Sequence, residues 1–335
     1  MSLEHDFKDK IRNDSIEATM VVGGSGFIGR HLVKRLSEEE KSVVSVYHRR
    51  LPEPLAHVYP VCSDLSSIDL LAAPLRGVKT VYYLAWENSF ISSSDPLHFD
   101  LDFSKCSHNI SIFNNLLRAM ELAGTQRLIF LSTLGAGRKA NTNFLKEKYL
   151  AEFAALNSSI PEKLILRSGV VFSENIGEDP LLSSISDLMK FPLVYPVPSF
   201  KGRLFPINIS DLVDILMKLG TLELSENAGL FEVSGQDSIS VSELFKIIAD
   251  KYTKGTRIKL SGVFGDKLLP LFEKHHRRGD PTLRPSIRDY LSIEHQLDEQ
   301  TNIKNPLCDL FPVQFKSIRD VLKPGSSGLK RVKTA

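Results

Sequence analysis

A glycine-spaced turn near the start of the chain limits the possible folds more than any other feature. The run Thr19–Val22 leads into Gly23, Gly26 and Gly29, and an amphipathic pattern from Phe27 to Leu36 follows at once. Glycine permits the unusual dihedrals of a tight turn, close approach of the backbone to a pyrophosphate, and close packing of a helix on a strand. Since a helix N-terminus offers free N–H groups to an anion, the segment predicts a strand–turn–helix unit that binds a nucleotide.

The overall composition is that of an ordinary globular protein. The 335 residues are 42% hydrophobic, enough for one large or two modest domains, and the net charge of +2 gives no reason to expect a nucleic-acid partner. The chain contains three cysteines, which lie far apart in the sequence: Cys62, Cys106 and Cys308. They predict a reducing, cytoplasmic location and no metal site. We expect no membrane span, because no apolar run is long enough, and no signal peptide.

Strand and helix patterns alternate through the first half of the chain. The predicted strands after the glycine turn are 43–47, 58–61, 80–84, 127–131 and 163–167, and the longer helices are 103–122 and 144–155. Such alternation predicts an α/β fold with a Rossmann-like, doubly wound parallel sheet. We expect this domain to cover residues 16–172, with segments near 203–222 and 229–235 returning to it. A smaller substrate lobe would cover most of 173–325, between flexible termini at 1–15 and 326–335.

Several motifs occur in an order that resembles the short-chain dehydrogenase/reductase superfamily, in its extended or atypical branch. The resemblance covers roughly residues 17–245. It is carried by the glycine turn, Asp64-Leu65, Leu84-Ala85, Ser132-Thr133, Lys148 with Ala151-Glu152, the run Leu166–Phe172, and later segments at 203–212 and 229–244. The resemblance implies a protein that binds a nicotinamide dinucleotide and acts on a carbonyl or nucleotide-sugar substrate.

The resemblance also implies a role for each matching residue. Thr133 would take the position of the catalytic hydroxyl, and Lys148 that of the active-site lysine, which also holds the nicotinamide ribose. The other implied cofactor-binding residues are Gly23, Gly26, Phe27, Ile28, Gly29, Asp64, Leu65, Leu84, Ala85, Trp86 and Ser132. Two plainer roles stay open, because Thr133 also fits an ordinary strand end and Lys148 a solvated helix position.

One departure from the family pattern concerns the chemistry itself. The family places a tyrosine four residues before its lysine, on the same helical face, to move a proton to or from the substrate oxygen. Here that position holds Phe144, which has no proton to give, and the chain contains no Tyr-x-x-x-Lys elsewhere. Tyr149 follows Lys148 directly and lies about 100° around the helix from it. A register using Thr142 and Lys146 would spoil the match downstream, which leaves Thr133 and Glu87 as candidate proton carriers.

The end of the second predicted strand bears on the choice of cofactor. NAD-binding proteins usually carry Asp or Glu there to bind the ribose hydroxyls, but this chain has Tyr47-His48-Arg49-Arg50. Arg49 or Arg50 would suit a 2′-phosphate, because a guanidinium pairs well with phosphate oxygens. The sequence therefore favours NADP over NAD, with a solvated basic turn as the alternative.

Three functions are compatible with these features, and the sequence favours the first, with the other two as alternatives. The first is an NADP-dependent oxidoreductase, or a related epimerase or dehydratase, with altered proton chemistry. The second is a non-catalytic member that binds NADP as a structural ligand or sensor, and the third is a dinucleotide-binding scaffold for protein contacts. Phe144 leaves open whether the chain is an enzyme, and the sequence indicates neither the small-molecule substrate nor whether the protein is a homodimer.

Overall fold

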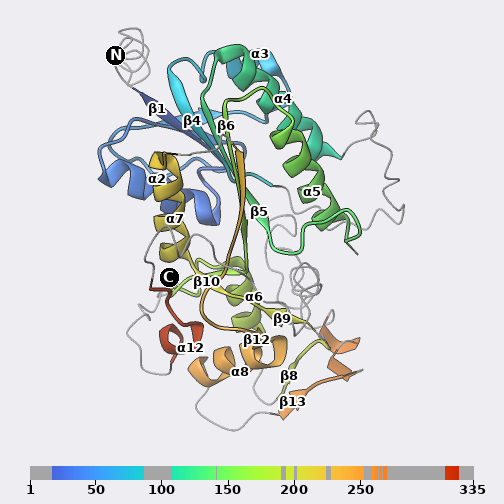
Figure 1. Ribbon diagram of the computed structural model, residues 1–335. Coiled ribbons are helices and arrows are strands. Elements are labelled where there is room, and N and C mark those ends of the chain that lie inside the picture. The colour runs from blue at the N-terminus through green and yellow to red at the C-terminus, as the bar shows by residue number, and fades with distance from the viewer. Residues whose placement is uncertain are drawn as a thin grey trace. The chain divides into compact units, whose positions relative to one another are not determined.

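The computed structural model describes residues 17–86, 107–140, 142–189, 194–199, 202–223, 228–252, 258–262, 264–265, 267–269 and 314–323 (Figure 1). These residues form two compact units. The first unit lies within residues 1–88, 92–167 and 212–232, and the second within 89–91, 168–211 and 233–335. Each unit has its own cluster of buried apolar side chains, as an independent packed body requires.

A seven-stranded sheet organises the first unit, with the strand order β11-β6-β5-β4-β1-β2-β3. The strands are β1 (Ala18–Val22), β2 (Val43–Tyr47), β3 (Val58–Cys62), β4 (Val78–Tyr83), β5 (Arg127–Thr133), β6 (Glu162–Ser168) and β11 (Ala228–Val233). The pairs β1–β2, β2–β3, β1–β4 and β4–β5 are parallel. Four of the five residues in β1 and in β2 are buried, because helices cover both faces of such a sheet.

Several helices belong to the described part of this unit. They are α2 (Phe27–Glu38), α3 (Ile68–Ala72), α4 (His108–Ala123), α5 (Asn143–Leu156) and most of α7 (Ile209–Thr221). In α4 the buried residues Ile110, Phe113, Leu117 and Met120 recur every three or four positions, and Gly124, at φ +69°, ends the helix in the left-handed conformation. In α5 the Thr142 hydroxyl accepts a hydrogen bond from the Leu145 N–H and so caps the first turn.

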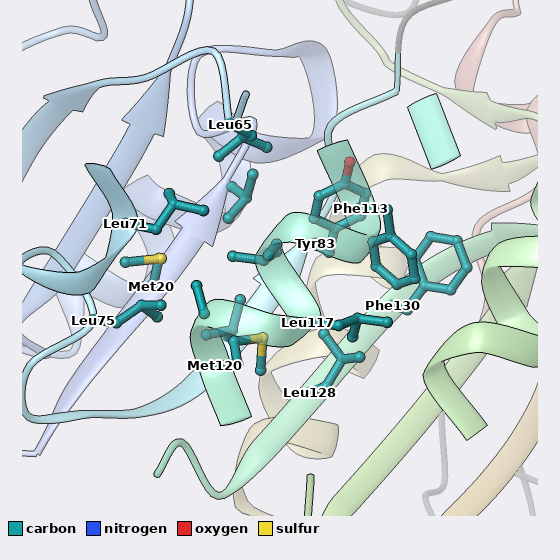
Figure 2. Packing of buried hydrophobic residues seen from close by; sticks show 14 of the residues in the cluster. Met20, Leu65, Leu71, Leu75, Tyr83, Phe113, Leu117, Met120, Leu128 and Phe130 are labelled. Atoms are coloured by element: carbon teal, nitrogen blue, oxygen red, sulfur yellow. The ribbon is translucent and has the colours of Figure 1, made fainter. Parts of the chain in front are cut away.

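Aromatic rings join β4, α4 and β5 in the core of the first unit (Figure 2). The ring of Phe113 lies 4.7 Å from that of Tyr83 and 4.9 Å from that of Phe130, measured between centroids. Trp86 extends the cluster, with its ring 6.1 Å from Phe130. These contacts hold the carboxyl ends of β4 and β5 side by side, which is where the candidate site residues lie.

The second unit contains shorter elements around its own core. Its strands pair as β7 (Val171–Phe172) with β10 (Ile207–Asn208), β9 (Arg203–Leu204) with β12 (Ile239–Ser240), and β8 (Val194–Pro196) with β13 (Ile258–Leu260). Its helices are α6 (Pro180–Leu188), α8 (Val241–Tyr252) and α12 (Ile318–Val321). The buried Asp179 accepts a hydrogen bond from the Leu182 N–H and caps α6.

The Rossmann-like fold predicted from the sequence is confirmed by the parallel sheet and its covering helices. Differences are confined to element ends and short pieces. Helix α4 begins at His108, whereas the pattern predicted a start at residue 103. Residues 103–106 lie outside the described residues. The five-residue α3 is too short to give a clear periodic signal. The predicted flexible termini, 1–15 and 326–335, also lie outside the described residues, and the predicted domain boundaries stay predictions.

Candidate functional site

The order of the strands in the sheet reverses between β1 and β4. β1 lies between β2 and β4, so the chain leaves β1 toward one edge of the sheet and returns at β4 to build the other half. In open α/β sheets, ligands bind beyond the carboxyl ends of the strands at such a reversal. Gly23 follows the end of β1 and Leu84 follows the end of β4, so two of the predicted motifs meet at this point.

The glycine turn packs directly against the residues that follow β4. Gly23 has φ +87°, and a Cβ atom at this position would lie 2.8 Å from the backbone nitrogen of Ala85. The Gly23 and Gly24 N–H groups both donate to the Val46 carbonyl at 3.0 Å. Only glycine fits here, because a side chain would strain the backbone and collide with the next strand. The turn and Leu84-Ala85 are thus two walls of one site.

Two further glycines allow the turn and helix α2 to approach closely. A Cβ atom on Gly29 would lie 2.1 Å from the Gly23 carbonyl oxygen, and one on Gly24 would lie 2.1 Å from the Ser45 hydroxyl. Gly29 is part of the predicted motif. Gly24 is not, although the doublet Gly23-Gly24 was a signal that the turn packs on β2 as well as β4.

Helix α2 begins at the turn with an end suited to an anion. Its first turn contains Phe27 and Ile28 and no acidic side chain, and its N-cap, Gly26, provides no capping side chain. The N–H groups of a first helical turn have no intrahelical acceptor, and the helix dipole places positive charge at this end. A phosphate would satisfy these donors.

Basic side chains follow β2 close to the turn. His48, Arg49 and Arg50 are all exposed, directly beyond Tyr47. The His48 carbonyl lies 3.6 Å from the sulfur of the exposed Cys62, which ties the end of β2 to the end of β3. The guanidinium groups of Arg49 and Arg50 therefore lie at the surface beyond the end of β2.

The Asp64-Leu65 motif forms a strained turn beyond β3. Leu65 is buried yet has φ +60°, a conformation uncommon for residues other than glycine. The Asp64 carboxylate accepts hydrogen bonds from the Ser66 N–H at 2.9 Å and hydroxyl at 2.7 Å, and the backbone bond is the main reason that the Asp64 pKa is lowered. Asn115 on α4 donates to the carbonyls of Leu65 and Ser66, at 3.1 and 3.0 Å. No motif pointed to Asn115, because it lies 50 positions from Leu65 along the chain.

Lys148 is buried among aromatic rings. Its Nζ donates to the Leu131 carbonyl at 3.0 Å and lies 4.1 Å from the ring centroid of Trp86, 5.0 Å from that of Phe130 and 5.9 Å from that of Phe144. Burial lowers the pKa of the amine to about 7, while the charges of the Glu152 and Glu147 carboxylates act in the opposite direction. The structure therefore makes Lys148 a buried residue, in contrast to the solvated position that the sequence left open.

Phe144 stands one turn before Lys148 on α5, where the family pattern has a tyrosine. Its ring faces the amine and brings no hydroxyl to the site. Tyr149 is half-buried on the same helix. Lys148 therefore has an apolar neighbour where the family pattern has an acid. Phe144 cannot donate a proton for general acid catalysis.

Ser132 and Thr133 at the end of β5 differ in what they contact. The buried Ser132 hydroxyl donates to the Glu152 carboxylate at 2.5 Å. The half-buried Thr133 has only a long 3.5 Å contact from its hydroxyl to the Leu134 carbonyl. Ser132 is committed to the protein, whereas the Thr133 hydroxyl is available to a ligand.

A buried ion pair lies behind these residues. Glu152, with a side chain 3% exposed, receives two hydrogen bonds from Arg167 at 2.8 and 2.6 Å, in addition to that from Ser132. Arg167 also contacts Glu232 of β11 at 3.3 Å. The network joins β5, α5, β6 and β11, and so fixes the helix that carries Lys148.

Comparison with protein families bears on the same part of the chain. Residues 19–155 match the model of the NAD dependent epimerase/dehydratase family. These residues form a domain of that family. The match contains the glycine turn, Asp64-Leu65, Leu84-Ala85 and Lys148, and it confirms the predicted resemblance to extended or atypical short-chain dehydrogenases/reductases for this domain.

Curated relatives share the family but differ in what their names say they do. The chain is 26% identical over 239 residues to NADH dehydrogenase [ubiquinone] 1 alpha subcomplex subunit 9, mitochondrial, of Arabidopsis thaliana, covering 69% of this chain and 56% of that protein. It is also 26% identical over 167 residues to the mouse sterol-4-alpha-carboxylate 3-dehydrogenase, decarboxylating, covering 45% of this chain and 43% of the relative. The chain thus spans about half the length of these relatives.

Solved structures share the fold. A nucleoside-diphosphate-sugar epimerase from Staphylococcus aureus matches with a TM-score of 0.66 at 16% identity, over 91% of this chain and 99% of its own. The Bordetella bronchiseptica enzyme WbmH, in complex with NAD+, matches with a TM-score of 0.58 at 16% identity, over 74% of this chain and 85% of its own.

Three further expectations from the sequence concern Glu87, a metal site and a membrane span. Glu87, the second candidate proton carrier, lies outside the described residues. Within the described ranges, no three His, Cys, Asp or Glu side chains gather as a metal site would require. No helix in the described part of the chain is long and apolar enough to cross a membrane.

Proposed function

We propose that the chain binds a nicotinamide adenine dinucleotide, NADP in preference to NAD, and holds it as a structural or sensing ligand. The glycine turn supports this, because a Cβ atom at Gly23 or Gly29 would collide with the backbone of Ala85 or of Gly23, so only glycines allow the close packing of strand, turn and helix that is typical of a dinucleotide-binding turn. When bound, such a cofactor supplies hydride-transfer chemistry. The residues of this chain would bind and orient it: the first turn of α2 for the phosphates, Asp64 and Leu65 for the adenine, and Arg49 or Arg50 for a 2′-phosphate.

One observation carries the non-catalytic part of the proposal. Phe144 occupies the position of the proton-donating tyrosine, and the amine beside it is covered by Trp86 at 4.1 Å. Purified protein should bind NADPH but oxidise or reduce no carbonyl compound or nucleotide sugar offered with it, as measured by absorbance of the reduced cofactor. Brisk turnover with any such substrate would contradict the proposal. Phe144→Tyr is the matched variant, because it adds only the missing hydroxyl.

The preference for NADP rests on the basic end of β2. Arg49→Ala should weaken NADP binding by about ten- to hundredfold, since a hydrogen bond to a charged group contributes roughly 1.5–3 kcal/mol. NAD affinity should change little, because NAD has no 2′-phosphate. Calorimetric titration with both cofactors measures the ratio of the NADP affinity to the NAD affinity. Arg35→Ala, at an exposed position of α2, is the control. Equal losses for NADP and NAD would remove this role from Arg49, and tighter binding of NAD by the unmodified protein would reverse the assignment.

A second candidate function is an NADP-dependent oxidoreductase, or an epimerase or dehydratase, with altered proton chemistry. The available hydroxyl of Thr133 favours it, because this group could hold a substrate oxygen or a water at the end of β5. Thr133→Val keeps the shape and removes the hydroxyl. If a substrate is found, its turnover should fall in this variant, and undiminished turnover would exclude Thr133 from the reaction.

The assembly state of the protein and its location in the cell are also matters of proposal. One relative is named as a subunit of a mitochondrial NADH dehydrogenase complex, and nucleotide-sugar enzymes share the fold, so both a protein assembly and a sugar-nucleotide ligand are compatible with this chain. The cytoplasmic location and the homodimer considered from the sequence stay predictions. Cell fractionation and analytical ultracentrifugation would test them.

A further inference from the structure

The two halves of the candidate cofactor site differ in how much of their polar surface is available. In the adenine and phosphate half, Asp64, Arg49 and Arg50 are exposed. The first turn of α2 leaves its N–H groups without intrahelical acceptors. This half therefore presents exposed charged side chains and the N–H groups of a helix N-terminus.

In the other half, the polar groups that would meet a nicotinamide riboside are engaged with other groups of the protein. The Lys148 amine donates to the Leu131 carbonyl at 3.0 Å, and Ser132 donates to Glu152 at 2.5 Å. Phe144 has only its ring to offer. The polar groups of this half are therefore committed to the protein, apart from Thr133.

The ring of Trp86 also lies against the Lys148 amine. Its ring centroid is 4.1 Å from Nζ, a distance at which a cation and an aromatic face attract each other, and Lys148 is 7% exposed. For the amine to reach ribose hydroxyls, it must leave this ring and the Leu131 carbonyl. Trp86 directly follows Leu84-Ala85, so its indole fills the site from the end of β4.

We infer that this chain selects its ligand by the adenosine diphosphate half, and that the nicotinamide riboside adds little to binding. The ligand class is then wider than dinucleotides and includes ADP-ribose and its 2′-phosphate. The inference rests on the proposed function, because it assigns the same site and the same phosphate contacts. It adds that Trp86 and Lys148 together fill the place of the nicotinamide riboside.

Calorimetric titration with three probes tests the inference on the unmodified protein. NADP+ and 2′-phospho-ADP-ribose should bind within about threefold of each other, and nicotinamide mononucleotide should not bind measurably. Trp86→Ala should raise the affinity for NADP+ at least tenfold and leave that for 2′-phospho-ADP-ribose unchanged. Phe153→Ala, an exposed aromatic position on the same helix as Lys148, is the control and should alter neither.

The outcomes separate the two proposals. Binding of NADP+ ten times or more tighter than 2′-phospho-ADP-ribose by the unmodified protein would overturn the inference and leave the proposed function standing. An equal rise in the affinities for NADP+ and 2′-phospho-ADP-ribose in Trp86→Ala would also overturn the inference and leave the proposed function standing. Failure of every adenine nucleotide to bind would overturn both. The comparison of probes on the unmodified protein needs no variant, so it decides the matter even if Trp86→Ala does not fold.

Discussion

Replacing Glu152 by alanine should lower the free energy of unfolding by about 3 kcal/mol, because breaking a buried ion pair leaves the charge of its partner only partly compensated. Glu152 is 2% exposed and accepts two hydrogen bonds from Arg167 and one from Ser132. Its loss leaves the Arg167 guanidinium with Glu232 as its remaining carboxylate partner among the described residues. Chemical denaturation followed by circular dichroism measures the change.

Two controls separate this effect from the general loss of a carboxylate. Asp214→Ala removes the partner of Arg35 in a pair whose side chains are about half exposed, and it should cost less than about 1 kcal/mol. The double variant Glu152→Leu with Arg167→Met removes both buried charges and should recover most of the stability lost by Glu152→Ala. A loss below about 1 kcal/mol in Glu152→Ala would mean that the network does not hold α5 in place.

Gly29→Ala should weaken dinucleotide binding by about a hundredfold or more, because displacing the turn removes more than one charge-assisted hydrogen bond to the phosphates. The added Cβ atom would lie 2.1 Å from the Gly23 carbonyl oxygen and 2.9 Å from the Gly24 Cα atom. Since both neighbours are backbone atoms, the turn itself must move.

Gly177→Ala is the matched control for this variant. A Cβ atom at Gly177 would have only an ordinary contact, 3.5 Å from the Asn175 side chain, and Gly177 lies in the second unit. It should leave cofactor affinity unchanged. If Gly29→Ala binds NADPH as well as the unmodified protein does, the phosphates do not lie over this turn.

The fold could be predicted because its signals are local. Gly23, Gly26 and Gly29 marked the first turn, and the apolar runs of β1 and β2 marked strands covered on both faces. Short elements such as α3 and the two-residue strands of the second unit gave no comparable pattern. They depend on tertiary contacts between distant residues, which no local window contains.

The site was predicted as a set of positions, but not as a set of contacts. The motifs placed Lys148 and Phe144 correctly on one helix. That Trp86 covers the lysine amine, and that Asn115 holds the Leu65 turn, depends on side chains brought together by β4 and α4. Sequence spacing cannot give such distances, because they follow from how the sheet and helices pack.

Titration of tryptophan fluorescence with NADPH tests the central claim most directly. Trp86 is the only tryptophan in the chain, and it lies against Lys148 in the candidate site. We expect a saturable change in its emission, with one site per chain, and no consumption of NADPH when carbonyl compounds or nucleotide sugars are added. Unchanged emission together with no heat of binding in calorimetry, or rapid oxidation of the bound NADPH by an added substrate, would contradict it.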